Sequence, residues 1–96
     1  MEVIWDDKAF IAFNKILDYI SKDSPKSASK IADKVIETFN KIAKHPFIYP
    51  ADKYKRNNTN LYRAFNLYRI RISYKVEESR ILVVRCRHTS QLPLYY

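Results

Sequence analysis

The sequence has 96 residues, which predicts one domain over residues 1–96 and excludes a multidomain enzyme, because domains usually run to roughly 100–200 residues. Its 47% hydrophobic and 15% aromatic residues are typical of an ordered globular domain rather than a disordered tail. Eighteen Lys and Arg residues against ten Asp and Glu residues give a net charge of +8, and every arginine lies after residue 50. Guanidinium groups suit phosphates, so the second half is the natural place to bind a nucleic acid or an acidic protein, with a solvated basic face as the alternative.

Several missing residue patterns exclude whole classes of site. The sequence contains no glycine, so it has neither a glycine-rich phosphate loop nor a GxSxG nucleophile elbow. One cysteine, Cys86, and two well-separated histidines, His45 and His88, give no zinc spacing, and we expect no metal and no cofactor. Cys86 has no partner for an internal disulfide, and no apolar segment approaches the ~18 residues of a membrane span. The sequence therefore predicts a cytoplasmic protein with no membrane partner.

The first half predicts a strand followed by two helices. Residues 2–5 form a β-type run, and an apolar stripe at helical spacing predicts a helix over about residues 7–21. Its members are Phe10, Phe13, Leu17 and Ile20. Ser24-Pro25 is a helix start signal, and the second helix should continue to about Lys44, before His45-Pro46. Its apolar stripe is Ile31, Val35, Phe39 and Ile42. Two helices joined by about three residues fold back on each other as a hairpin.

The second half predicts a loop and three strands. Prolines and an asparagine cluster indicate a loop before residue 61, and β-type runs follow over residues 61–65, 68–76 and 80–87. In the middle run, alternation places Arg69 and Arg71 on the face opposite the apolar residues. Residues apolar on both sides predict that the last strand is central. The expected fold is α+β, in the order β-α-α-β-β-β, with the helical hairpin packed on one face of a mainly antiparallel four-stranded sheet whose other face is basic.

The arginines near the end of the sequence are candidates for a phosphate clamp. Arg85 and Arg87 are two residues apart on a strand, so their side chains leave the same face. Arg63, on a neighbouring strand, converges with them if the register allows. The alternative is that these arginines are outward-facing residues paired with Glu77 or Glu78.

His88 and the tyrosines that follow it are candidates for proton transfer. His88 follows the last strand, and histidine is the commonest general acid or base. Tyr95 and Tyr96 could stack on a base or donate a proton, and Lys53 and Lys55 could contact phosphates. The alternatives are a turn hydrogen bond for His88, packing of Tyr95 on the sheet, and simple solvation of the lysines.

Several segments together resemble the RelE/ParE superfamily of bacterial toxins. They are Asp23-Ser24-Pro25, Tyr62-Arg63-Ala64-Phe65, residues 68–74 and, most specifically, Arg85-Cys86-Arg87-His88-Thr89-Ser90-Gln91-Leu92-Pro93. The resemblance covers nearly the whole chain and implies a basic toxin that a cognate acidic antitoxin wraps and silences, with operator DNA bound only through that antitoxin. The sequence departs from the common pattern in having no loop glycines, so we expect Asn57, Asn58 and Asn66 to accept the turn conformations.

The two branches of this superfamily imply different targets. Ser24-Pro25 and Arg87-His88 resemble the ParE branch more closely, which implies a toxin that poisons DNA gyrase. The alternative is a RelE-like, metal-independent mRNA interferase acting on the ribosome, whose catalytic residues would be Arg63, Arg85, His88 and Tyr95. Residues expected to bind the nucleic acid or target are Lys53, Lys55, Arg69, Arg71, Arg87 and Tyr96. A non-toxic nucleic-acid-binding module is a further alternative.

Overall fold

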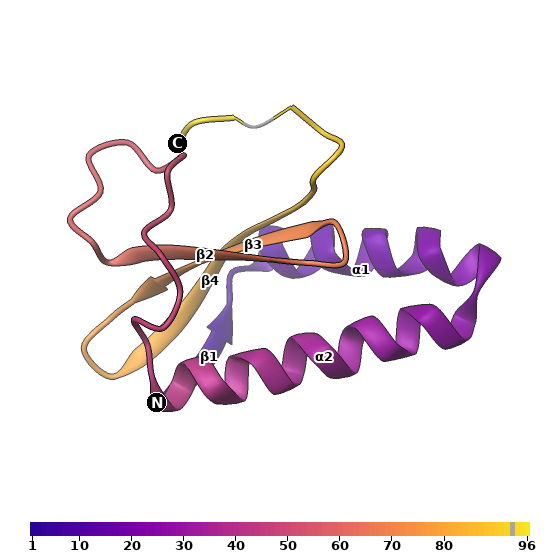
Figure 1. Ribbon diagram of the computed structural model, residues 1–96, viewed down its shortest axis with the longest axis horizontal. Helices are drawn as coiled ribbons and strands as arrows, with labels where there is room; N and C mark the ends of the chain where they lie inside the picture. Colours follow the sequence, from indigo (N-terminus) through magenta and orange to yellow (C-terminus); the bar gives the residue numbers. More distant parts are fainter. Residues whose placement is uncertain (93) are drawn as a thin grey trace.

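The computed structural model describes residues 1–92 and 94–96 and confirms the predicted order of elements. The elements are β1 (Glu2–Trp5), α1 (Asp7–Asp23), α2 (Pro25–Lys44), β2 (Tyr62–Leu67), β3 (Ile70–Val76) and β4 (Arg80–His88). Figure 1 shows α1 and α2 as a hairpin beside the sheet, with the end of the chain next to the long loop that precedes β2. Among the described residues, no helix is both long and apolar enough to cross a membrane.

The helix starts follow the predicted capping signals. Asp6 caps α1, because its side chain accepts a hydrogen bond of 3.1 Å from the backbone N–H of Lys8. Ser24 caps α2 in the same way, accepting 3.1 Å from the N–H of Ser27, with Pro25 at the first helical position. Only Ser24 separates the two helices, so they must turn back on each other.

The sheet has the order β1-β4-β3-β2, with β1 parallel to β4 and the other two pairs antiparallel. This order confirms that β4 is central and that the sheet is mainly antiparallel. Strand β3 lies between β2 and β4, so no residue of β2 pairs directly with a residue of β4.

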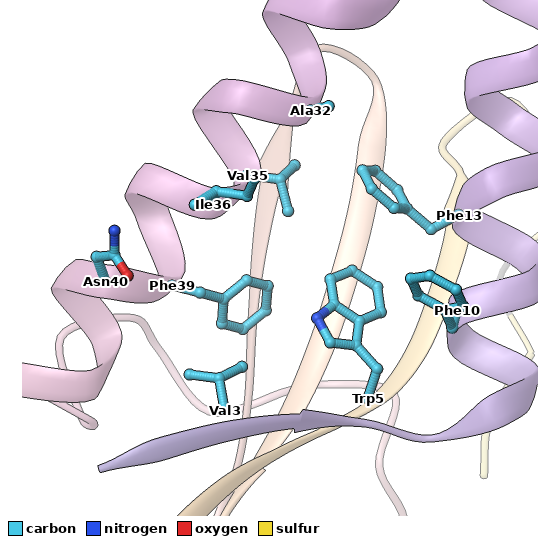
Figure 2. A pocket seen from close by; sticks show the side chains of 9 residues that line it. All are labelled: Val3, Trp5, Phe10, Phe13, Ala32, Val35, Ile36, Phe39 and Asn40. Atoms are coloured by element: carbon cyan, nitrogen blue, oxygen red, sulfur yellow. The ribbon is translucent and has the colours of Figure 1, made fainter.

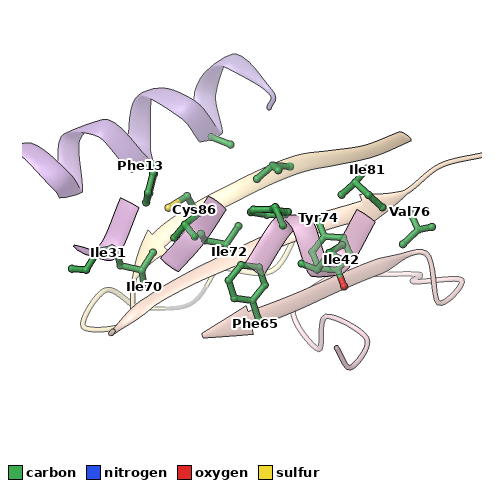
Figure 3. Packing of buried hydrophobic residues seen from close by; sticks show 14 residues of the cluster. Phe13, Ile31, Ile42, Phe65, Ile70, Ile72, Tyr74, Val76, Ile81 and Cys86 are labelled. Atoms are coloured by element: carbon green, nitrogen blue, oxygen red, sulfur yellow. The ribbon is translucent and has the colours of Figure 1, made fainter. Parts of the chain in front are cut away.

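The core lies between the helical hairpin and one face of the sheet (Figure 3). The predicted stripe of α2 is buried as expected: Ile31, Val35, Phe39 and Ile42 are at most 7% exposed. In α1, Phe13 is buried, but Phe10 is 52% exposed. Phe10 shares the predicted face of α1 but is not buried in the core, because it lies at the edge of the hairpin, where its ring packs against Trp5 of β1 on one side only.

The β2–β3 turn differs from the sequence prediction. Tyr68 and Arg69 have positive φ values of 49° and 64°, so they form the turn, and β3 begins at Ile70 rather than Tyr68. Positive φ at both central residues is typical of a type I′ turn, whose twist matches that of the two strands it joins. Asn66 is consequently a strand residue, contrary to expectation.

In the loop before β2, Asn57 and Asn60 have positive φ values of 53° and 72°. This confirms the expected turn at Asn57. Asn58 instead pairs with Tyr62 through its side chain: the Asn58 amide donates to the Tyr62 carbonyl over 2.9 Å and accepts from its N–H over 3.1 Å. These bonds fix the point at which the loop enters β2.

Candidate functional site: the basic outer face of the sheet

A β-bulge in β4 decides which way the arginines point. Val83 lies opposite the buried Tyr74, but Arg85 lies opposite Ser73, so Val84 is an extra residue in β4. Strict alternation from Val83 would have turned Arg85 toward the helices, and the bulge turns it to the other side. Arg85 and Arg87 therefore share one face, as predicted. We call this side of the sheet, with Arg71, Ser73, Lys75, Arg85 and Arg87, the outer face.

Tyrosines lie against most of these cations. The Tyr54 ring centre is 4.9 Å from the Arg71 guanidinium carbon and 5.4 Å from that of Arg87. The Tyr96 ring centre is 4.6 Å from the guanidinium carbon of Arg85. Cation–π contacts of this kind are each worth ~0.5–2 kcal/mol, depending on how far water is excluded. The outer face is thus a layer of alternating aromatic rings and cations and not a bare basic surface.

A buried carboxylate, Asp52, lies beside this layer. It is 2% exposed and accepts from Arg71 over 2.8 Å, from the Tyr96 hydroxyl over 2.6 Å and from the Tyr54 N–H over 3.1 Å. Burial alone would raise the pKa of Asp52, but the hydrogen bonds from Tyr96, Arg71, Ser73 and Tyr54 outweigh it and hold the pKa below its ordinary value. Sequence reasoning missed this residue. A signal was present, since Asp52 is the only acidic residue between Glu37 and Glu77.

The last three residues of the sequence cross the outer face at this point. The Tyr96 N–H donates to the Tyr54 carbonyl over 3.0 Å, and the Arg56 N–H donates to the Tyr96 carbonyl over 2.6 Å. The Arg85 guanidinium donates to the Leu94 carbonyl. Burial, followed by the hydrogen bond to Asp52, raises the pKa of the Tyr96 hydroxyl. At neutral pH Tyr96 is therefore a fixed hydrogen-bond donor.

Arg63 does not join Arg85, contrary to the expected convergence. It lies opposite Tyr74 in the β2–β3 pair, so its side chain points to the side of the helices. Its guanidinium donates to the carbonyls of Asn60 over 3.0 Å and Tyr49 over 3.1 Å and lies over the Phe47 ring. Through these contacts Arg63 holds the loop before β2 in place.

His88 also lies away from Arg85. It pairs with Ile70, a core residue, so its side chain leaves on the side of the helices, where it lines a hollow with Lys15 and Tyr19 of α1. Its Nδ1 atom is 2.7 Å from the Ser90 hydroxyl and accepts from the Ser90 N–H over 3.1 Å. The structure thus shows the turn hydrogen bond that the sequence offered as the alternative for His88.

The other predicted residues lie around the rim of the outer face. Tyr95 is 58% exposed, with its ring centre 5.5 Å from that of Tyr54. Lys55 lies over the rings of Tyr62 and Tyr96, Lys53 is exposed in the loop, and Arg69 is exposed in the β2–β3 turn. Glu77 pairs with Arg80 and Lys75, so within the described chain it serves neither Arg85 nor Arg87. No group of three or more His, Cys, Asp or Glu suited to a metal occurs among the described residues.

A second surface feature is an apolar groove of about 280 Å³ between β1, α1 and α2. Figure 2 shows Trp5 between Phe13 on one side and Phe39 on the other, and the ring centres are 5.2 Å and 5.7 Å from that of Trp5. Its lining residues are Val3, Trp5, Phe10, Phe13, Ala32, Val35, Ile36, Phe39 and Asn40. Phe10 and Ile36 are more than half exposed there, so the groove is open to solvent.

Comparisons with known proteins agree with this architecture. The chain is similar in structure to a chain of the chromosomal ParDE toxin–antitoxin system from P. aeruginosa, with a TM-score of 0.67 and 18% identity, over 92% of this chain and 95% of that one. A search of curated proteins gave no match. The family model described as the ParE toxin of the type II toxin-antitoxin system, parDE, matches residues 3–93. Because this match spans almost the whole sequence, the chain belongs to the ParE toxin family of type II toxin–antitoxin systems.

Proposed function

We propose that this toxin arrests growth by binding DNA gyrase, and that an acidic ParD-type antitoxin silences it. The observation that carries the choice of target is the separation of the groups that a nuclease would need. RNA cleavage by the 2′-hydroxyl requires a base, an acid and positive charge around one phosphate. Here Arg63 and His88 leave the sheet on the helix side, whereas Arg85 and Tyr96 lie on the outer face. Binding to a protein target needs no such convergence.

A paired assay with one purified preparation tests the target. Expression without the antitoxin should stop growth, and the protein should inhibit gyrase supercoiling while leaving ribosome-bound mRNA uncut in primer extension. Ribosome-dependent cuts with unaffected supercoiling would overturn the choice of gyrase. Salt-dependent nucleic-acid binding with normal growth would instead support a non-toxic binding module.

Single substitutions separate the two mechanisms further. In a nuclease, His88→Gln or Arg85→Ala should cost ~10²- to 10⁴-fold in cleavage. In a gyrase-binding toxin, neither change alone should abolish toxicity, because a few anchors share the binding energy. We place such anchors among residues 89–96, including the exposed Tyr95, and at the exposed rim residues Lys53 and Arg69. Removal of residues 89–96 should then abolish toxicity.

The apolar groove is the proposed docking site for an apolar stretch of the antitoxin, while acidic residues of the same segment reach the basic second half of the chain. Ile36→Glu would place a charge in the groove and should weaken antitoxin binding by about tenfold or more. Ser29→Glu, on an exposed part of the same helix outside the groove, is the matched control and should have little effect. Equal effects of the two changes would contradict docking at the groove.

Charge should control how fast the antitoxin associates. Opposite charges steer encounter, and salt screens that attraction within about a Debye length. We expect the association rate to fall as ionic strength rises. A rate that does not respond to salt would show that the basic half is not part of the docking surface.

A further inference from the structure

We propose that residues 94–96, here called the terminal segment, cover Arg85 on the outer face, and that the Tyr96–Asp52 hydrogen bond holds them closed, so that an acidic protein segment reaches Arg85 only after they move. This device is independent of which target the toxin binds. It rests on three features of the contact between the terminal segment and the outer face.

The first feature is that the terminal segment contacts Arg85 both at a face and at an N–H group of its guanidinium. The Tyr96 ring lies against the guanidinium carbon at 4.6 Å from its centre, and the Leu94 carbonyl accepts a hydrogen bond from the same guanidinium. An incoming carboxylate that binds Arg85 in the bidentate way would compete with the Leu94 carbonyl for the Nη1 group. Arg85 is consequently occupied within its own chain when the terminal segment is in place.

The second feature is that one buried side-chain bond adds to the backbone bonds of the closed position. The Tyr96 hydroxyl donates to Asp52 over 2.6 Å, and the backbone of Tyr96 pairs with Tyr54 and Arg56. By contrast, the side chains of Leu94 and Tyr95 are 68% and 58% exposed, so they bury little surface. Hydrogen bonds to charged groups are stronger than those between neutral groups, and of the two such bonds that the terminal segment makes, only that of the Tyr96 hydroxyl is shielded from water. The Tyr96 hydroxyl is therefore the main side-chain anchor.

The third feature is that Asp52 keeps other partners when Tyr96 leaves. It still accepts from Arg71 over 2.8 Å and from the Tyr54 N–H over 3.1 Å. The negative charge of Asp52 therefore keeps a counter-charge and a hydrogen-bond donor, and the loop that carries it stays attached to β3. Opening is then a local event that leaves the sheet intact.

The test compares Tyr96→Phe with Tyr95→Phe, which removes a hydroxyl that makes no hydrogen bond to any other described residue. Amide hydrogen exchange of the backbone N–H groups of Arg56 and of position 96 reports opening, since both bonds exist only in the closed state. We expect Tyr96→Phe to speed exchange at these amides by roughly 10- to 100-fold and to leave β3 unchanged. Tyr95→Phe should exchange like the wild type.

Binding of a short oligoglutamate peptide, used as the acidic probe, tests whether opening exposes Arg85. Apparent affinity rises in proportion to the fraction of molecules that are open while the closed state dominates, so Tyr96→Phe should bind the peptide more tightly by about the factor by which its exchange is faster, and adding Arg85→Ala should remove that gain. Unchanged exchange in Tyr96→Phe would show that the hydroxyl does not hold the terminal segment. Faster exchange without tighter binding, or a gain that survives Arg85→Ala, would show that the terminal segment does not control access to Arg85.

Discussion

The pairing of Asp52 with Arg71 allows a quantitative test of how the loop before β2 is held. The Asp52 side chain is 0% exposed and that of Arg71 is 13% exposed. Asp52→Ala would leave a mostly buried guanidinium without its counter-charge, which costs ~3–5 kcal/mol. It would also remove the acceptor for the Tyr96 hydroxyl and the Tyr54 N–H. Since domains are stable by only ~5–15 kcal/mol, this change should consume a large fraction of the stability.

A double mutant separates the charge from the hydrogen bonds. In Asp52→Ala/Arg71→Met no buried charge remains, so the loss should shrink to the ~1–3 kcal/mol expected for unsatisfied donors. Urea unfolding followed by Trp5 fluorescence measures both values, because Trp5 packs against Phe39 in the core and lies away from the mutated pair. A loss below ~1 kcal/mol for the single mutant, or equal losses for the single and double mutants, would refute a buried, coupled pair.

Three further measurements test the pKa of Asp52, the burial of Cys86 and the cap of α2. The lowered pKa of Asp52 means that its stabilisation is present above its ordinary pKa of 3.8 and is lost as pH falls through the folded value, so between about pH 5 and pH 2 the melting temperature should fall more steeply for the wild type than for Asp52→Asn. Burial raises the pKa of Cys86 to about 12, and its thiol should react with a disulfide reagent at about pH 8 only as fast as the protein unfolds, which rapid labelling of the native protein would contradict. Ser24→Ala removes the cap of α2 and should cost ~1 kcal/mol in urea unfolding, whereas Ser29→Ala, away from the helix end, should be nearly neutral.

The helices and the order of elements were predictable because their signals are local. Ser24-Pro25 marks the start of α2 and His45-Pro46 marks its end, through capping geometry and the fixed φ of proline. The apolar stripe of α2 predicts which side of the helix is buried, and the continuous apolar run of residues 81–84 predicts that the last strand is central. Each of these inferences needs only neighbours along the chain.

The boundary of β3, which carries part of the candidate site, was only partly predictable from such local signals. Period-two alternation correctly placed Arg71 opposite the core, but it extended β3 back to Tyr68 because nothing in that pair of residues marks a turn. The positive φ values at Tyr68 and Arg69 arise because two strands with a native twist must be joined by two residues. Glycine normally signals this, and the sequence has none.

The sequence by itself determined which chemical groups this protein has. Its second half is basic and contains arginines and tyrosines that suit acidic partners, and it has no glycine-rich loop. Only the tertiary structure decided which of those groups meet. The bulge at Val84 turns Arg85 outward, the strand order keeps Arg63 and Arg85 apart, and Asp52 joins Tyr96 from 44 residues away in the chain. Such contacts depend on pairing register and on the burial of a charge that must find partners, and neither is encoded in the spacing of neighbouring residues.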